Sequence, residues 1–397
     1  MNPSLLVLNA GSSSIKFAAY RVDDGTPKSL VRGKLDGIGV GPAFSAKGPS
    51  GELLEERSFL PADVADHEQA LVRVDEFLRS RLPRETPAAV GHRIVHGGSR
   101  LVAPARVDDA TLAELEALVP LDPLHQVPSL TALKSARSRY PEAVHVACFD
   151  TAFHRGHPEV ADAIPLPRSL REAGLRRYGF HGLSYEYIAG RLREIDPAAA
   201  RGRVVVAHLG NGASLCAMKD GRSVDSTMSF TALDGLVMGT RPGVLDAGAL
   251  LWLLGRGWDR ERLAHLLWHE SGLLALSETS PDLRDLLGSD APFAQLAVSV
   301  FVYVAVKQAA GMVAALGGLD AFVFTAGIGE NQPETRARIS AGLRFLGVEV
   351  DEEANRRGDL RISPKGARVA TFVISTDEES VIARHTVFLM SGKTPPS

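Results

Sequence analysis

Apolar and polar positions at the start of the chain form blocks that predict three short strands joined by tight turns. Residues 5–8 are a continuous apolar run of the buried-strand type, which breaks at the polar turn 9–14 and resumes over 15–22. The Asp24-Gly25 pair is a strong signal for a two-residue hairpin, and a further strand at 30–35 follows it. The chain therefore opens with a predicted antiparallel β-unit.

This β-unit recurs about half a chain later. The same order of apolar run, turn, strand, hairpin and strand is found at 204–207, 208–214, 215–218, 220–221 and 223–227. A shift of 199 residues places Gly11 on Gly210 and Asn9 on His208. Two copies of one unit predict two related domains that face each other across a ligand-binding cleft.

Between and after the two β-units the pattern is that of an α/β protein. Apolar positions recur with helical spacing at 65–81, 108–118, 184–195, 291–316, 333–343 and 378–389. Continuous apolar runs predict buried strands at 144–149, 321–325 and 369–374. The strand at 321–325 leads into a glycine-rich connection at 326–331, and the helix from Pro333 follows it.

The turn at 9–14 is a candidate phosphate-binding loop. A short turn of asparagine, glycine and serine between buried strands can present backbone N–H groups and hydroxyls to phosphate oxygens, with Lys16 adding positive charge. An ordinary β-turn has the same composition, but its recurrence at 208–214 favours phosphate contact. The chain has no Walker-type loop, and Gly327-Ile328-Gly329 lacks the third glycine of a dinucleotide-binding fingerprint.

Two arginines lie beside glycines at predicted strand ends. Arg93 precedes Gly97-Gly98, and Arg241 lies between Gly239 and Gly243. A guanidinium group suits carboxylates and phosphates because it donates paired hydrogen bonds, although a surface arginine beside a turn is the ordinary alternative for either one.

Acidic residues and one histidine complete the candidates. Asp150 and the triplet 377–379 follow predicted strands, where carboxylates can bind Mg²⁺; for Glu379 we favour the alternative of a helix N-terminal acid. His181 lies between Phe180 and Gly182 and resembles a site residue, whereas His154 and His157 flank Gly156 in a predicted loop.

Composition bounds the class of protein. The chain has 397 residues, 45% of them apolar and 23% charged, and a formal net charge of −3, so it predicts a globular protein with no nucleic-acid surface. Met1-Asn2-Pro3 is no basic signal-peptide start, and the longest apolar run, 296–306, is short of the roughly 20 residues of a membrane helix. With two cysteines in apolar runs, these features predict a cytoplasmic protein without a membrane partner.

Taken together, the motifs resemble those of the acetate kinase family. The matching segments occur in family order at 6–17, 91–98, 149–154, 177–182, 208–212, 238–241 and 324–331. The resemblance implies two duplicated RNase H-like domains of the actin, Hsp70 and sugar kinase type, with ATP bound between them. It implies an N-terminal domain at 1–149 completed by a C-terminal helix at 378–397, and a nucleotide-binding domain at 150–377.

The resemblance also implies roles for single residues. Catalytic roles are implied for Arg93, Asp150, His181 and Arg241. Asn9, Ser14 and Lys16 would lie near the transferred phosphate, and further nucleotide contacts would come from His208, Leu209, Gly210, Asn211, Gly212, Asp282, Leu283, Arg284, Gly327, Ile328, Gly329, Glu330 and Asn331. Glu378 would bind Mg²⁺ (or Mn²⁺), with Asn9 as a second candidate ligand. Arg93 would bind the acetate carboxylate, and Val95, Leu124 and Phe180 would enclose its methyl group.

The implied activity is Mg²⁺-dependent phosphoryl transfer from ATP to acetate by a homodimer. A propionate or short-chain acyl kinase of the same fold is one alternative, and a non-enzymatic nucleotide switch is another. The paired cationic candidates argue against the switch, because nucleotide binding alone needs no carboxylate site. The sequence departs from the usual family residues at Gln126, Ala232, Ala247, Pro281 and Asp377, and none of these is a proposed catalytic group.

Overall fold

The computed structural model describes residues 3–83 and 85–392, and these form two compact units. One unit is made of the described parts of Met1–Ala152 and Asp377–Ser397, and the other is Phe153–Thr376. The beginning of the chain, where a signal peptide is not expected, lies partly outside the described residues, as do the last five residues of the predicted C-terminal helix.

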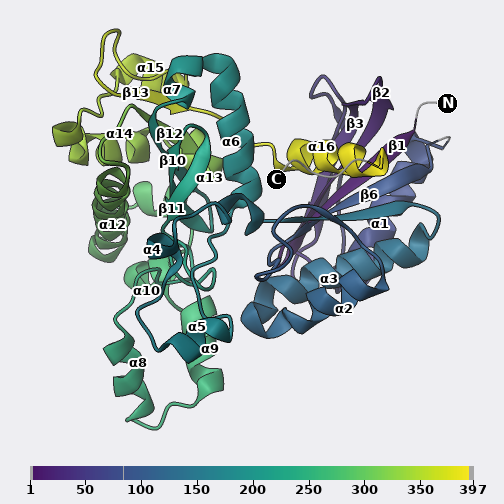
Figure 1. The fold of residues 1–397 in the computed structure, drawn as a ribbon, viewed down its shortest axis with the longest axis horizontal. Helices are drawn as coiled ribbons and strands as arrows, with labels where there is room; N and C mark the ends of the chain where they lie inside the picture. Colours follow the sequence, from purple (N-terminus) through teal and green to yellow (C-terminus); the bar gives the residue numbers. More distant parts are fainter. Residues whose placement is uncertain (1–2, 84, 393–397) are drawn as a thin grey trace. The chain divides into compact units, whose positions relative to one another are not determined.

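The first unit is built on a mixed sheet whose strand order is β5-β4-β3-β2-β1-β6-β8-β7 (Figure 1). Its strands are β1 (Ser4–Ala10), β2 (Ser14–Asp23), β3 (Thr26–Asp36), β4 (Ala43–Lys47), β5 (Leu53–Ser58), β6 (Pro87–Ile94), β7 (Ala105–Arg106) and β8 (Val144–Phe149). Strands β1, β2 and β3 are antiparallel neighbours, whereas β6 and β8 continue the sheet in parallel with β1. The carboxyl ends of β1, β6 and β8 therefore lie along one edge.

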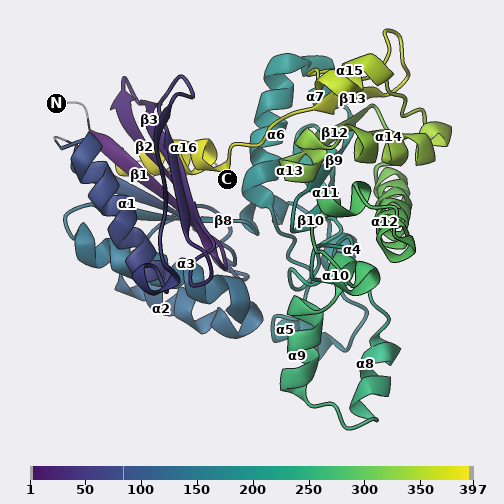
Figure 2. The same ribbon diagram turned by 180° about the vertical axis from the view of Figure 1, so that it is seen from behind.

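Helices cover both faces of this sheet. Helices α1 (His67–Arg81) and α3 (Pro123–Arg139) pack on one face, while the C-terminal helix α16 (Glu378–Met390) packs on β1, β6 and β8 (Figure 2). The short helix α2 (Asp109–Ala117) precedes α3. A Cβ at Gly91 would lie 2.3 Å from Thr386 Oγ1 and 2.6 Å from Ile382 Cγ2, so only glycine permits this approach of α16 to β6.

The second unit repeats the central topology of the first. Its sheet has the order β11-β10-β9-β12-β13, with β9 (Arg203–Leu209), β10 (Ala213–Lys219) and β11 (Arg222–Ser226) antiparallel and β12 (Ala321–Thr325) and β13 (Ala370–Val373) parallel to β9. This is the arrangement of β3-β2-β1-β6-β8. The predicted duplication is present in the fold.

Helices of the second unit pack on this sheet and extend beyond it. Helix α6 (Gly182–Ile195) contributes Tyr185, Ile188 and Leu192 to a core that includes Val206 and Val323. The other helices are α4 (Glu159–Asp162), α5 (Arg168–Glu172), α7 (Pro197–Ala200), α8 (Ala247–Leu254), α9 (Arg260–His269), α10 (Gly272–Ser277), α11 (Leu283–Leu287), α12 (Pro292–Leu316), α13 (Ala326–Asn331), α14 (Pro333–Gly342) and α15 (Glu352–Arg357).

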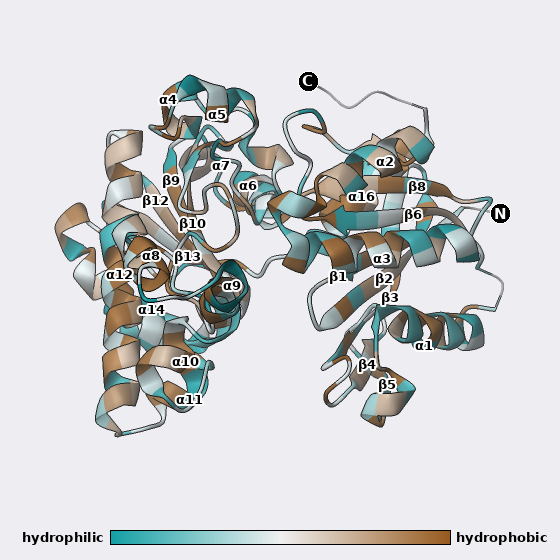
Figure 3. Ribbon diagram, turned by 90° about the horizontal axis from the view of Figure 1, so that it is seen from below, coloured by the Kyte–Doolittle hydropathy of each residue, from teal (hydrophilic) through white to brown (hydrophobic). Residues whose placement is uncertain are grey.

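Helix α12 matches the helix predicted at 291–316, but it differs from the expectation that no apolar segment is long enough to span a membrane. The unbroken apolar run ends before Lys307, but the helix continues to Leu316, and within the described residues it is long and apolar enough to cross a membrane by length and composition. It packs against β9, β10 and β11 and against α10, α11 and α14, and 39% of its most apolar 18-residue window is buried (Figure 3).

Two buried histidines join neighbouring strands β6 and β8. His92 Nε2 lies 3.0 Å from His145 Nδ1, and His145 Nε2 lies 3.1 Å from the Tyr140 carbonyl oxygen. Since a carbonyl only accepts, His145 donates from Nε2, so its Nδ1 accepts from His92. His92 Nδ1 is buried without a hydrogen-bond partner among the described residues, and burial holds the pKa of both histidines below the usual value.

We expect this pair to make stability depend on pH. The unfolded histidines gain protons as the pH falls below about 6.5, while the folded ones resist protonation, so their contribution is complete above about pH 6.5 and is lost as the pH falls further. Each such histidine contributes a slope of up to about 1.4 kcal/mol per pH unit. The free energy of unfolding in urea, measured from pH 7.5 to 5.5, should fall less steeply with falling pH for His92→Gln than for the wild type. An equal pH dependence in the two proteins would contradict the assignment.

Candidate functional site

One cluster of candidate residues lies at the carboxyl edge of the first unit's sheet. Asn9 is near the end of β1, Arg93 is near the end of β6, and Asp150 follows β8. The Arg93 guanidinium donates to Asp150 Oδ2 from Nη2 at 2.6 Å and from Nε at 3.1 Å, and its Nη1 donates to Asn9 Oδ1 at 3.3 Å. The parallel strands thus bring together three residues that are far apart in the sequence.

The start of α16 brings two carboxylates to the same place. The Asn9 side-chain nitrogen donates to Glu378 Oε2 at 2.9 Å and to Glu379 Oε1 at 3.0 Å. The interpretation of Glu379 as only a helix N-terminal acid is therefore incomplete, because its carboxylate contacts Asn9. The capping role belongs to Asp377, which accepts from the Ser380 amide at 3.0 Å and pairs with Arg32 at 2.5 Å.

The charges in this cluster shift one another's titration. Desolvation disfavours the Lys16 cation, but the charges of Glu378 and Glu379 outweigh it and raise its pKa. Burial similarly works against the Arg93 cation, and Asp150 and then Glu378 more than compensate, so its pKa is raised. Burial, and after it the charge of Glu378, raises the pKa of Glu379 against the opposing effect of Lys16. Because two carboxylates lie next to each other, binding of an additional cation there would reduce their repulsion.

A second cluster of candidate residues lies in the other unit, around the turn between β9 and β10. A Cβ at Gly212 would lie 2.8 Å from Arg241 Nη2 and 3.3 Å from His181 Nε2, so the Arg241 and His181 side chains converge on this glycine. Arg241 is held by a 2.6 Å bond from Nη1 to the Ala232 carbonyl and lies over the Trp268 ring, 5.7 Å from its centroid. A fixed guanidinium beside a glycine suits an incoming phosphoryl group.

His181 is fixed from several directions. It precedes α6 in the left-handed conformation, with φ of 59°, and its Nδ1 lies 2.8 Å from Ser214 Oγ. Its ring stacks on His208 at a centroid distance of 4.1 Å, and His208 Nδ1 lies 2.8 Å from Ser184 Oγ. A left-handed residue other than glycine is strained, and such strain is concentrated at functional sites.

A cavity of about 450 Å³ in the same unit brings together many of the predicted nucleotide contacts. Its lining includes Gly210, Asn211, Asp282, Leu283, Arg284, Gly327, Ile328 and Asn331. Six further residues line it that were not among the predicted nucleotide contacts: Met238, Gly239, Leu273, Pro281, Phe301 and Gln332. The volume falls within the roughly 300–1,000 Å³ of small-molecule sites. Asp282 caps α11 by accepting from the Arg284 amide at 2.8 Å, and it also pairs with the Arg284 guanidinium.

The glycine-rich connection predicted at 326–331 is itself helical. It forms α13, which begins with Ala326 in the left-handed conformation at φ of 65°. Arg336 is buried beneath it and donates from Nη1 to the carbonyls of Gly329 at 3.0 Å and Glu330 at 2.8 Å. These bonds satisfy carbonyls at the end of a very short helix, and no local sequence signal marks Arg336 for this role.

Other predicted site residues do not line this cavity. Leu209 is fully buried, and Gly329 packs against the backbone of Phe324. Glu330 accepts from the Thr376 amide at 3.1 Å. Ser14 closes the first turn by accepting from the Gly11 amide at 2.8 Å, and His67 Nε2 lies 2.7 Å from the Gly11 carbonyl.

The predicted methyl-binding residues divide between the units. Val95 is buried in the first unit, where Leu124 lies at the start of α3, and Phe180 is buried in the second. Their joint role as a pocket remains a prediction.

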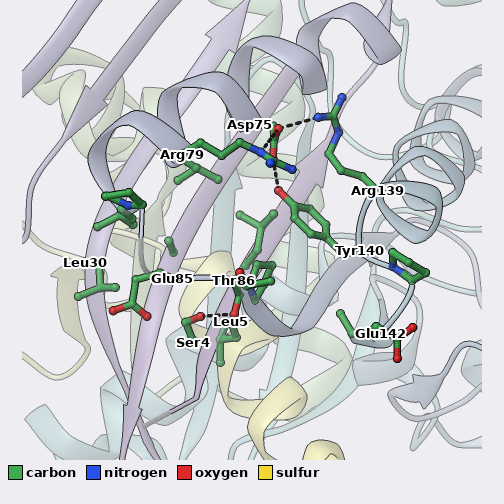
Figure 4. Close-up of a pocket in the computed structure, with 18 residues that line it drawn as sticks. Ser4, Leu5, Leu30, Asp75, Arg79, Glu85, Thr86, Arg139, Tyr140 and Glu142 are labelled. Atoms are coloured by element: carbon green, nitrogen blue, oxygen red, sulfur yellow. Dashed lines mark hydrogen bonds and ion pairs between the residues drawn. The ribbon is translucent and has the colours of Figure 1, made fainter. Parts of the chain in front are cut away.

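A separate cavity of about 470 Å³ lies in the first unit beside α1, α3 and β1, and none of the predicted site residues lines it (Figure 4). Asp75 is the central polar group there: its Oδ2 accepts from Arg79 at 2.7 Å and Arg139 at 2.6 Å, and its Oδ1 accepts from the Tyr140 hydroxyl at 2.5 Å. These bonds tie α1 to α3, so the network has a structural role.

The described residues offer a metal ion only a small number of side-chain ligands. Among the described residues no group of three or more histidine, cysteine, aspartate or glutamate side chains is placed to hold a metal ion. The two carboxylates near Asn9 match the one or two that Mg²⁺ uses alongside water and phosphate oxygens. Because the Asn9 amide oxygen accepts from Arg93, the glutamate oxygens are the better candidate ligands.

The duplicated topology defines a two-domain, actin-like scaffold, and the two cation-bearing clusters and the cavity are what a phosphotransferase of that class requires. Residues 4–384 match the Acetokinase family, and the chain belongs to that family.

Relatives and solved structures agree with this assignment. The chain is 47% identical over 396 residues to an acetate kinase of Nitrobacter hamburgensis, covering 99% of this chain and 98% of the relative. It is 48% identical over 390 residues to an acetate kinase of Rhizobium meliloti, covering 98% and 99%. Among solved structures, a propionate kinase from Francisella tularensis has a TM-score of 0.88 at 32% identity, with 97% and 99% coverage. The Porphyromonas gingivalis acetate kinase has a TM-score of 0.84 at 33% identity, with 98% and 100% coverage.

Proposed function

We propose that this chain catalyses reversible phosphoryl transfer between ATP and acetate, giving acetyl phosphate and ADP. The observation that carries the proposal is the convergence of Arg241 and His181 on Gly212, near a cavity lined by the predicted adenosine contacts. An arginine and a histidine that meet beside a nucleotide pocket provide hydrogen-bond donors for a phosphoryl group in transfer. The acetate kinases that are 47% and 48% identical support acetate as the acceptor.

The roles follow from the chemistry of an anionic acceptor. A carboxylate is already ionised and needs no general base, so the main barrier is the approach of one anion to another. Arg93 would bind the acetate carboxylate, with Asp150 holding its guanidinium in orientation. Arg241 and His181 would stabilise the charge of the transferring phosphoryl group, and Asn9, Ser14, Lys16, Asn211 and Gly212 would contact the phosphates.

A second candidate acceptor is propionate, which the likeness to the Francisella propionate kinase favours. Val95, Leu124 and Phe180 are proposed to enclose the acyl group. One methylene in an apolar pocket changes selectivity by roughly 10–200-fold. The test compares kcat/KM for acetate, propionate and butyrate in an ADP-release assay. We expect acetate to be preferred over propionate, and a preference for propionate would assign the chain to the alternative activity.

We propose that Glu378 and Glu379 hold Mg²⁺ (or Mn²⁺), which would neutralise phosphate charge when bound. Both carboxylates reach the Asn9 amide, and the charge of Glu378 raises the pKa of Glu379, so a divalent cation would relieve their repulsion. Glu378 is the principal candidate.

Replacing these two glutamates separately tests the assignment. We expect Glu378→Gln to raise the Mg²⁺ concentration for half-maximal activity about 10–100-fold, the range seen when groups at a metal site are changed. Glu379→Gln is the comparison variant and should have a smaller effect, because Glu378 is the principal candidate ligand. The measurement is a Mg²⁺ titration at saturating ATP and acetate. Equal shifts for the two variants would show that the metal is shared evenly, and no shift in either would place it elsewhere.

We also propose that the protein is cytoplasmic and that residues 150–377 are its nucleotide-binding domain. We further propose that it forms a homodimer. Support for the dimer comes from exposed apolar side chains on and beside α8, including Val244, Leu251 and Trp252. Monomeric proteins rarely expose apolar patches of large area. Light scattering after size-exclusion chromatography measures the mass directly, and the mass of one chain, 42.4 kDa, would contradict the dimer.

A further inference from the structure

A chain of buried polar side chains lies behind His181 in the second unit. His154, His157, Ser223, Cys216 and Asp162 are all buried. Ser223 Oγ is the centre of the chain, at 2.8 Å from His154 Nδ1, 2.7 Å from His157 Nε2 and 3.2 Å from Cys216 Sγ. His157 Nδ1 lies 3.1 Å from Asp162 Oδ1. The predicted loop at 154–157 is therefore an ordered internal network.

The direction of each hydrogen bond is determined by its acceptor. His154 Nε2 lies 2.9 Å from the Phe180 carbonyl, which can only accept, so Nε2 carries the proton. Burial lowers the pKa of His154 to about 3, so the ring is neutral and its Nδ1 must accept from Ser223. The hydroxyl proton of Ser223 is then donated to His154, and His157 Nε2 also lies 2.7 Å from the Ser223 hydroxyl. The network therefore orients the His154 ring so that its Nε2–H group donates to the Phe180 carbonyl.

This N–H acts on the peptide that leads into His181. The Phe180 carbonyl belongs to the peptide group between Phe180 and His181, and His181 has the strained φ of 59°. On the other side of His154, a Cβ at Gly179 would lie 2.6 Å from the ring, and Gly179 has φ of 76°. The His154 ring therefore packs against one residue of the turn while it bonds the next. Arg155 adds a bond to the Tyr178 carbonyl at 2.6 Å.

We propose that His154, oriented by Ser223, is a positioning residue that holds the Phe180–His181 peptide so that the His181 ring faces Gly212. The inference rests on the proposed function for its kinetic consequence. Without the bond from His154, the Phe180 carbonyl would be buried with one partner fewer, and the 180–181 peptide would be free to rotate out of the left-handed conformation. Rotation there moves the whole His181 side chain relative to Arg241.

The side chains of glutamine and asparagine separate this role from simple core packing. The amide nitrogen of glutamine reaches about as far as histidine Nε2, whereas that of asparagine reaches only as far as Nδ1. His154→Gln should keep the bond to Phe180 and most of the kcat. His154→Asn should lose it and lower kcat by about 10–100-fold, the effect of displacing a catalytic group by about 1 Å. Ser223→Ala, which removes the hydroxyl that orients the ring, should lower kcat in the same direction.

The test combines kinetics with a direct view of His181. For each variant we would measure kcat, the KM for acetate and for ATP, the Kd of ADP by calorimetry, and the ¹³Cα signal of His181 in ¹³C-histidine-labelled protein, assigned with His181→Gln. We expect kcat and the His181 signal to change together in His154→Asn and Ser223→Ala, with the ADP Kd unchanged. The proposal is overturned if the kcat of His154→Gln is as low as that of His154→Asn. It is also overturned if Ser223→Ala retains both the wild-type kcat and the wild-type His181 signal.

Failure of the proposed function would look different. A folded wild type that turns over neither acetate nor propionate would remove the kinetic readout, while the His181 signal of the three variants would still test the positioning. If the His181 signal of all three variants is the same as that of the wild type, His154 does not hold the peptide.

Discussion

Replacing Arg241 with alanine is expected to lower kcat by about 10²–10³-fold while the fold is retained. Loss of one fixed donor to transition-state charge has an effect of this size. The Arg241 guanidinium is held by the Ala232 carbonyl at 2.6 Å and lies over Trp268, so it is oriented before substrate arrives. A group that stabilises charge mainly in the transition state affects kcat more than KM.

A matched control is available in the same unit. Arg262 also lies over a tryptophan, with its guanidinium 3.6 Å from the Trp258 centroid, but it is on α9 and exposed. Arg262→Ala should leave kcat within about twofold, since surface substitutions away from a site have small effects. Steady-state kinetics with both substrates saturating gives the comparison. A folded Arg241→Ala enzyme with near wild-type kcat would remove Arg241 from the catalytic groups.

Replacing Arg93 with alanine is expected to reduce both activity and stability. The Asp150 side chain is 1% exposed, and in this variant it would lose the paired donors of Arg93. Removing one partner of a buried ion pair costs about 3–5 kcal/mol, because the remaining charge is left without compensation. Denaturant unfolding should therefore show a loss of several kcal/mol, alongside a loss of kcat/KM for acetate.

The double variant Arg93→Ala, Asp150→Ala separates the two effects. Removing both charges should restore much of the stability, since neither is left buried alone, but it should not restore activity. If the double variant is as unstable as the single one, the pairing is not the cause of the instability. If it regains activity, Arg93 does not bind the acetate carboxylate.

Much of the fold is predictable because its local signals agree with its long-range pairing. The Asp24-Gly25 and Asp220-Gly221 pairs both adopt positive φ, so each hairpin forms where the sequence predicts. The buried strands are short and apolar on both faces, and the parallel pairing of β1 with β6 brings Asn9 and Arg93 to one edge. The repeated β-unit also predicts the duplicated sheets, because the same local signals occur in both copies.

The features that the sequence did not reveal depend on contacts between distant segments. Helix α3 contains Pro128, which obscures its helical pattern, and it was not predicted. Helix α13 contains two glycines, and its carbonyls bond to Arg336, which lies on the following helix. The chain from Asp162 to Ser223 and Phe180 joins three separate segments. No local periodicity records such contacts.

The most direct test of the proposed activity is ³¹P NMR of the wild-type protein with ATP, Mg²⁺ and acetate. We expect an acetyl phosphate signal that appears in step with ADP and is absent when acetate is omitted. When acetyl phosphate and ADP are supplied instead, we expect the signal of ATP to appear. Release of ADP with inorganic phosphate and no acyl phosphate from any short-chain acid tested would contradict it.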